Sequence, residues 1–220
     1  MNIPLDIHTH RLPQTPGEAI VNCSPETFLP QEGGWYSVGI HPWSLHIDPE
    51  ASSSHPTLSQ RMECLEAVVR HPQVLAVGEA GLDKLTAAPL FLQMEVFELQ
   101  ARLAMKVHKP LVIHLVKAVA EVSALKRTLL PANPWIIHGF RGKAALAADF
   151  LRHGFYLSFG EKYQEEALRL MPADRLLIET DESTVLLDKL YARAAALRGV
   201  SSCELKKTVE RNVSKLFFKQ

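Results

Sequence analysis

Eight short apolar runs recur along the chain, and from the third run onward helix-patterned segments alternate with them. The runs cover residues 3–8, 18–23, 35–41, 73–79, 110–115, 134–139, 154–159 and 174–180. The helical patterns cover residues 58–71, 89–109, 117–130, 142–154 and 163–170. Near-continuous apolar strands that alternate with helices are typical of a parallel sheet covered on both faces. The pattern therefore predicts an α/β fold, a TIM-type (β/α)8 barrel.

The first two connections depart from an ideal barrel. Residues 8–17 contain two prolines, and residues 24–34 contain two more prolines and paired glycines. A parallel crossover normally needs about a dozen residues, usually helical. We therefore expect a compact barrel whose first two crossover helices are shortened or missing, as a single domain over residues 1–220. Two helices, at 184–198 and 202–218, are expected to finish the chain.

Composition narrows the class of protein. The 24 basic and 24 acidic side chains cancel, which is no footprint for general nucleic-acid or membrane binding. Three widely spaced cysteines favour neither a disulfide framework nor a zinc knuckle. The first residues show no signal-peptide pattern, and no apolar run is long enough to span a membrane. These absences predict a reduced cytoplasmic protein with no membrane association and no obligate protein partner.

Side chains that can bind metal follow the predicted strands. His8 and His10 lie two residues apart at the end of the first strand, so both point to the same face. The others lie at the ends of later strands and are Glu79, His114, His138 and Asp181. One histidine at a strand end is more often a hydrogen-bonded core residue than a ligand. Six such groups at the rim where barrel enzymes place their chemistry instead predict a site for two divalent cations.

Several motifs occur in an order that resembles one known family. They are DIHTH, GIHPW, GEAGLD, PLVIH, IIHGF and LLIETD. In this order they resemble the motifs of the TatD family of metal-dependent deoxyribonucleases, within the amidohydrolase-like barrel hydrolases. The resemblance covers nearly the whole chain. It implies a metal-dependent hydrolase that acts on ester bonds, with DNA as the expected substrate.

The resemblance also implies a role for each ligand. One metal would be bound by His8, His10 and Asp181, and the second by His114 and His138. Glu79 would bridge the two ions, and Asp181 would also accept the proton of the attacking water, which makes both catalytic. The expected cofactors are two divalent ions, with Zn, Mn or Mg as the alternatives; imidazole-rich sites suit magnesium less well.

The departures from the family pattern lie outside this ring. Where the family usually has arginine and then an acidic residue, this chain has Val116 and Lys117. Glu182 and Ser183 replace the usual Ser-Pro, and Gly139 replaces a cysteine. Loss of the arginine matters because its fork binds phosphate bidentately, whereas Lys117 could replace only its charge. These changes leave the metal site intact and alter the expected phosphate contacts.

Three residues near the expected mouth are candidates for substrate binding. His41 and Trp43 could stack on a base or hydrogen-bond a substrate, and Arg141 could reach an anion. The favoured function is a deoxyribonuclease or phosphodiesterase that acts on single-stranded DNA ends through metal-activated water. The alternative is hydrolysis of a small ester, lactone or amide, because a barrel and its metals do not fix the substrate. A metal-binding protein without catalysis is the third hypothesis.

Overall fold

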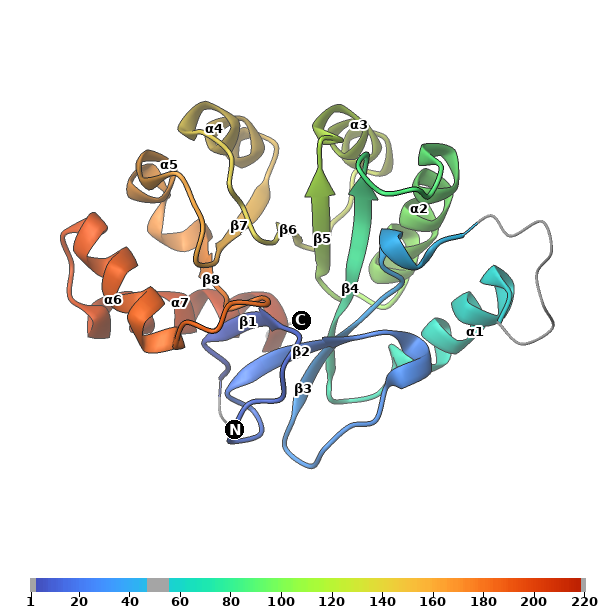
Figure 1. The fold of residues 1–220 in the computed structure, drawn as a ribbon, viewed down its shortest axis with the longest axis horizontal. Coiled ribbons are helices and arrows are strands. Elements are labelled where there is room, and N and C mark those ends of the chain that lie inside the picture. Colours follow the sequence, from blue (N-terminus) through green and yellow to red (C-terminus); the bar gives the residue numbers. More distant parts are fainter. Residues whose placement is uncertain (1–2, 47–55, 219–220) are drawn as a thin grey trace.

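Eight parallel strands form one barrel in the computed structural model, which describes residues 3–46 and 56–218. The strands pair in chain order from β1 to β8 (Figure 1). Their bounds are β1 Asp6–Thr9, β2 Ala19–Cys23, β3 Trp35–Val38, β4 Val74–Asp83, β5 Leu111–Val116, β6 Trp135–Ile137, β7 Phe155–Phe159 and β8 Leu176–Ile178. The barrel closes where Thr9 bridges Asp181, whose N–H donates to the carbonyl of His8 at 2.9 Å.

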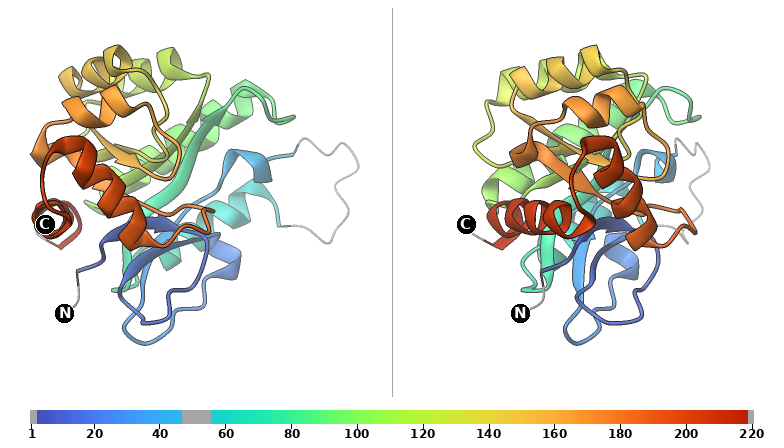
Figure 2. Two further views of the ribbon diagram at one scale, coloured as in Figure 1. Left: turned by 60° about the vertical axis from the view of Figure 1, so that its left-hand side comes forward. Right: turned by 90° about the vertical axis from the view of Figure 1, so that its left-hand side faces the viewer.

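Helices separate the later strands and pack outside them. Their bounds are α1 Leu58–Val68, α2 Leu90–Lys106, α3 Val119–Leu129, α4 Ala144–Arg152, α5 Glu165–Leu170, α6 Leu187–Arg198 and α7 Ser202–Val213. In Figure 2, α3 to α5 lie outside β5 to β8, on the side of the molecule away from β1 to β3. Strands buried on both faces require continuous apolar runs, and β6 and β7 are buried at every position.

The first two connections contain no α-helix, so the predicted compact barrel is confirmed. Between β2 and β3 there is only the short 3-10 helix Pro25–Thr27, which packs against α1. The last helix differs from the prediction, because α7 ends at Val213 and a π-helix covers Ser214–Phe218. The start of α7 follows from its sequence: the Ser201 hydroxyl accepts from Glu204 N–H, and the Glu204 carboxylate accepts from Ser201 N–H.

Buried aromatic and polar side chains join the helices to the barrel. Trp135 on β6 is fully buried, and its ring packs against Phe97 of α2 and Phe155 of β7. The Tyr191 hydroxyl of α6 donates to the carbonyl of Leu5 at 2.8 Å. No helix within residues 3–46 and 56–218 is long and apolar enough to cross a membrane.

Candidate metal centre

The carboxylate of Glu79 lies at the centre of the barrel mouth, with five imidazole rings around it. Its Oε1 lies 2.7 Å from His138 Nε2, 2.9 Å from His114 Nδ1 and 3.2 Å from His41 Nε2. Its Oε2 lies 3.2 Å from His8 Nε2 and 3.4 Å from His10 Nε2. Side chains from opposite sides of the barrel therefore meet on one carboxylate.

Asp181 completes the cluster from the segment after β8. Its Oδ1 lies 3.5 Å from His10 Nε2 and 4.0 Å from His8 Nε2. The backbone of Asp181 has φ 55°, a left-handed conformation that aspartate tolerates better than most residues. The rings of His8 and His138, which are 130 residues apart in the sequence, lie 4.2 Å apart between centroids. The structure thus brings together all six side chains that the sequence predicts as ligands.

The sequence predicts that Glu79 ends its strand, but β4 continues beyond it to Asp83. The register of β4 against β5 shifts between Val77 and Ala80, and this irregularity turns Glu79 toward the mouth. The glycines around it allow close backbone approach: a Cβ on Gly78, at φ 142°, would lie 2.6 Å from the carbonyl oxygen of Val112. Asn22 holds the glutamate, because its Oδ1 accepts from Glu79 N–H at 2.7 Å.

Glu79 is ionised despite its burial. Only 3% of its surface is exposed, and burial alone would raise the pKa of its carboxyl. The nearby imidazoles of His138 and His8 outweigh burial and hold the pKa of Glu79 well below its usual range. In the same pair, burial would lower the pKa of His138, but Glu79 and Glu179 raise it well above its usual value. These shifts favour a protonated His138 beside an ionised Glu79. A divalent cation would take the place of that proton, because a ligand histidine must be neutral.

Two more carboxylates lie behind the rings of His114 and His138. Asp83 Oδ2 lies 3.2 Å from His114 Nε2, and Glu179 Oε1 lies 3.3 Å from His138 Nδ1. Burial acts to raise the pKa of each carboxyl, but their partners keep both pKa values below the usual range. A carboxylate on the outer nitrogen of a metal-binding histidine fixes the ring and its tautomer.

Sequence reasoning gave these two carboxylates no such role. Asp83 also accepts from Leu85 N–H at 2.8 Å, which ties it to the loop after β4. Glu179 directly follows β8 and is fully buried. The signal available for both was position, because Asp83 comes four residues after the predicted ligand Glu79 and Glu179 comes two residues before the predicted ligand Asp181.

The ring of His8 lacks the hydrogen bonds that burial normally requires. It is fully buried, and neither ring nitrogen has a hydrogen-bond partner within the described part of the chain. Nε2 faces Glu79 at 3.2 Å without hydrogen-bond geometry. A buried polar group without a partner costs about 1–3 kcal/mol. A cation that accepts the Nε2 lone pair would remove that cost, so this ring fits a metal ligand.

His41 makes different contacts from the other four histidines. Its Nδ1 accepts from the backbone N–H of Trp43 at 3.1 Å, so the proton of the neutral ring is on Nε2. That Nε2–H then donates to Glu79 Oε1. His41, predicted as a substrate contact, therefore lies inside the cluster as a hydrogen-bond donor. The indole N–H of Trp43 donates to Asp83 Oδ2 at 2.7 Å, while 58% of the residue stays exposed.

The remaining predicted residue, Arg141, lies at the rim. Its Nη2 is 4.0 Å from Asp181 Oδ2, and 62% of its side chain is exposed. A pocket of about 320 Å³ opens beside it and includes Asp181 and Lys162 in its lining. Val116 is half-buried and Lys117 is exposed at the end of β5, so both positions that differ from the family pattern lie near the mouth.

The donor atoms form overlapping groups that suit divalent cations. Each group has its ligand atoms within 4.8 Å of one another. The groups are His8–His10–Asp181, His8–Glu79–His138, His41–Glu79–His114 and His138–Glu179–Asp181. Imidazole and carboxylate together are ligands for zinc and similar divalent ions. The geometry thus supports divalent metal binding at the mouth.

The sequence matches a family model over most of its length. Residues 28–218 match the model described as TatD related DNase. The chain belongs to the TatD family. Solved members share the fold: the TatD homologue YJJV of Escherichia coli has TM-score 0.74 and 20% identity, covering 90% of this chain and 85% of its own. The TatD family protein of Entamoeba histolytica has the same TM-score at 14% identity.

Curated relatives extend the match at the level of sequence. "Uncharacterized metal-dependent hydrolase YabD" of Bacillus subtilis is 40% identical over 120 residues, half of this chain and 47% of the relative. "3'-5' RNA nuclease TATDN2" of Homo sapiens is 32% identical over 74% of this chain and 22% of its own length. "3'-5' ssDNA/RNA exonuclease TatD" of Edwardsiella piscicida is 30% identical over 83% of this chain and 77% of its own length. The match thus spans less than half of the first two relatives.

Proposed function

We propose that this chain is a divalent-metal-dependent phosphodiesterase that hydrolyses single-stranded nucleic acid from an end, with DNA as the preferred substrate. The observation that carries the proposal is the single ionised carboxylate, Glu79, set among five imidazoles with Asp181 beside them. The names of the TatD relatives, which include 3'-5' ssDNA/RNA exonuclease, support the choice of substrate class.

We assign two divalent ions to this centre. His8, His10 and Asp181 would bind one ion, His114 and His138 the other, and Glu79 would contact both. The predominance of imidazole favours Zn or Mn over Mg. Bound divalent ions lower the pKa of water and polarise a phosphoryl oxygen. His41 would keep Glu79 in place through its Nε2–H, so we assign it to positioning within the centre.

The two oxygens of Asp181 face different directions, which suits two tasks. Oδ1 faces His10 and His8, whereas Oδ2 faces the rim, 4.0 Å from Arg141 Nη2. We assign Oδ2 as the proton acceptor for the attacking water. The hydrogen bond from Asp181 N–H to the carbonyl of His8 fixes the carboxylate against β1, so its direction is set before substrate arrives.

The rim offers a base-stacking surface and a cation. The exposed indole of Trp43 could stack on a base, an interaction that tolerates any sequence and favours single strands. The guanidinium of Arg141 lies where it could contact a phosphate near Asp181. With Val116 in place of the family arginine, Arg141 and Lys162 are the cations that we assign to the phosphate.

The test is an activity screen on the full chain loaded with zinc or manganese. Substrates are single-stranded DNA labelled at either end, the matching RNA, duplex DNA, and a model ester and lactone. We expect stepwise shortening of single-stranded DNA. Asp181→Asn should cut turnover by orders of magnitude while keeping the fold, because it removes a ligand charge and the proton acceptor. Its control is Glu182→Gln, which removes the neighbouring exposed carboxylate.

Two outcomes would contradict the proposal. Turnover of the ester or lactone with the same Asp181 dependence, but no nucleic-acid product, would favour the small-molecule hydrolase. Equal activity of Asp181→Asn and Glu182→Gln would exclude the assigned centre. Preferred cleavage of RNA would retain the centre and correct the substrate.

Metal removal should lower the stability of the folded chain. A ligand that binds only the folded state adds about 2.7 kcal/mol when present at a hundred times its Kd. We expect chelation to lower the Tm and to abolish activity, and added Zn or Mn to restore both, as read by calorimetry and by the nuclease assay. If elemental analysis and titration find no metal bound at neutral pH, the centre does not bind metal and the proposal is wrong.

A further inference from the structure

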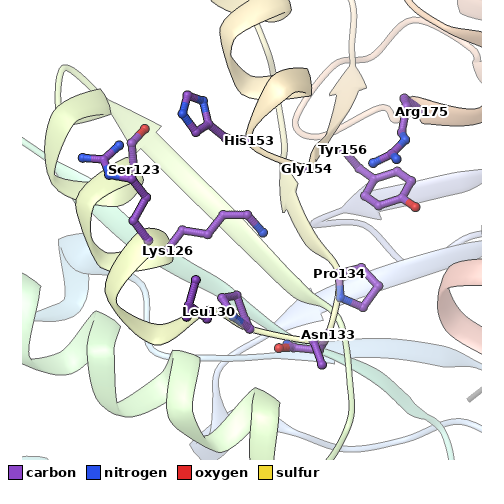
Figure 3. Close-up of a pocket in the computed structure, with 12 residues that line it drawn as sticks. Ser123, Lys126, Leu130, Asn133, Pro134, His153, Gly154, Tyr156 and Arg175 are labelled. Carbon is purple, nitrogen blue, oxygen red and sulfur yellow. The ribbon is translucent and has the colours of Figure 1, made fainter.

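A second pocket, of about 470 Å³, opens at the end of the barrel opposite the metal centre. Pro134 directly precedes β6, Gly154 precedes β7 and Arg175 precedes β8, so the pocket lies at the amino ends of these strands (Figure 3). In TIM barrels this end ordinarily serves stability rather than chemistry. A built pocket here therefore needs its own explanation.

Cations line this pocket, and no carboxylate is among its lining residues. Lys126 and Arg127 come from α3, and Arg175 comes from the turn before β8. The Lys126 ammonium lies 5.2 Å from the ring of Trp135 and 4.8 Å from that of Phe155. In the described part of the chain, neither Lys126 nor Arg127 has a carboxylate partner. Two of the three cations are thus held at one place without a carboxylate partner.

Arg175 is held in place by its neighbours. Its guanidinium carbon lies 4.7 Å from the ring of Tyr156, and its Nε is 3.7 Å from Asp174 Oδ2. Stacking on a ring orients the planar group and leaves its other N–H donors available. Burial, and then the charge of Arg175, lower the pKa of Lys126 to about 8. A bound anion would favour the charged form of Lys126 and offset the repulsion from Arg175.

Two polar side chains in the wall each have an oxygen without a hydrogen-bond partner in the described part of the chain. Ser123 and Asn133 are 7% and 9% exposed, and both line the pocket. Ser123 Oγ and Asn133 Oδ1 have no hydrogen-bond partner within residues 3–46 and 56–218. The amide nitrogen of Asn133 donates to the carbonyl of Lys109 at 2.8 Å, which fixes the side chain. Asn133 Oδ1 is an acceptor, so its missing partner is a hydroxyl or amine donor.

We propose that this pocket binds a small phosphate monoester that also carries hydroxyl or amine groups, the chemistry of a nucleotide. Lys126, Arg127 and Arg175 bind the phosphate, since charge-assisted hydrogen bonds to guanidinium and ammonium are the strong ones. Asn133 and Ser123 bind the hydroxyl or amine groups. The pocket volume is within the range of about 300–1,000 Å³ for small-molecule sites, and exposed Leu130 gives it an apolar wall.

The test measures binding of adenosine 5'-monophosphate, adenosine and inorganic phosphate to the metal-loaded full chain by calorimetry. We expect the monophosphate to bind more tightly than either of the other two. Lys126→Gln should weaken its binding about 10- to 100-fold, as expected for a hydrogen bond to a charged group. Arg127→Gln should weaken it severalfold, and less at high salt. The control is Lys215→Gln, the same charge change at an exposed residue of the π-helix.

Binding should also weaken as pH rises above 8. Lys126, with its pKa near 8, loses its charge there, whereas Arg127 and Arg175 stay charged. The other groups at this place are His153, which lines the pocket, and Asp149 and Asp174, which face His153 and Arg175. The monoester keeps its second negative charge across this range. Lys126→Gln should remove the pH dependence.

The pocket acts independently of the metal centre, so the two proposals can fail separately. Arg127→Gln should leave turnover on single-stranded DNA unchanged. If the monophosphate does not bind at millimolar concentration, or if Asp181→Asn abolishes binding while Lys126→Gln and Arg127→Gln keep it, the pocket proposal is wrong. If Lys126→Gln does not fold, Arg127→Gln decides alone, because Arg127 is exposed and has no hydrogen bond or ion pair with the described residues.

Discussion

The two sides of the metal centre are built differently. On the side of β5 and β6, each histidine has a buried carboxylate behind it: Asp83 behind His114 and Glu179 behind His138. On the side of β1, the ring of His8 has no hydrogen-bond partner in the described chain, and the His10 ring faces the carboxylates of Glu79 and Asp181. Side-chain exposure is 38% for His10 but 0% for His8, against 13% for His114 and 7% for His138, so on the β1 side only His10 is more open to solvent.

The difference indicates which side of the centre is preorganised for metal binding. Rings held by a carboxylate keep one orientation and one tautomer, so they are ready to bind an ion without reordering. The β1 side relies on backbone contacts, chiefly Asp181 N–H to the carbonyl of His8. The missing crossover helices are on this side as well, after β1 and β2. We therefore expect an ion to bind more tightly at His114 and His138 than at His8 and His10.

The largest effect should come from Glu79→Gln, which removes the charge that both sides share. Both ions should be lost or weakened, and turnover should fall by orders of magnitude, because five imidazoles then have no anion between them. Metal content by elemental analysis and nuclease turnover give the measurement, with Glu182→Gln as the matched exposed control. Retention of two ions by Glu79→Gln would show that Glu79 is no shared ligand and would remove the basis of the comparison.

Intermediate effects should follow from Glu179→Gln and Asp83→Asn, each of which keeps the shape of its side chain. Loss of such an outer carboxylate typically costs about 10- to 100-fold in metal affinity or activity. We expect the ion at His114 and His138 to weaken to the level of the other ion in both variants, so that titration shows two similar sites in place of two distinct ones. A loss confined to the ion at His8 and His10 would reverse the comparison.

The six predicted ligands could be found in the sequence because they lie at the ends of predicted strands. His8 and His10 share a face through the period of a strand, and carboxyl ends of parallel strands meet at one rim. The position at a strand end was therefore enough to predict that His114, His138 and Asp181 lie at the same rim. The absence of the first two helices was equally readable, because two short proline-containing connections leave no room for them.

The sequence could not predict contacts that depend on distances across the mouth. His41 looked like a substrate contact because it follows a strand in a loop, but the Pro42–Ser44 turn directs its ring onto Glu79. Glu179 and Asp83 are two or more residues from any predicted ligand on their own strand, and only the fold brings them to His138 and His114. Glu79 itself faces the mouth through a register irregularity in β4 that no periodicity shows.

The smallest effect should come from Arg141→Ala at the rim, outside both sides of the centre. With 62% of its side chain exposed and its Nη2 4.0 Å from Asp181, it can assist a phosphate without holding a metal. We expect kcat to change little and KM to rise about two- to fivefold, up to about 1 kcal/mol for an exposed ion pair. The rise should shrink as salt approaches 1 M, where the screening length falls to about 3 Å. Arg152→Ala on α4 is the control, because its exposed guanidinium pairs with Asp149 away from the mouth. A large fall in kcat with metal loss would instead place Arg141 within the centre, and an unchanged KM at low salt would show that it does not touch the phosphate.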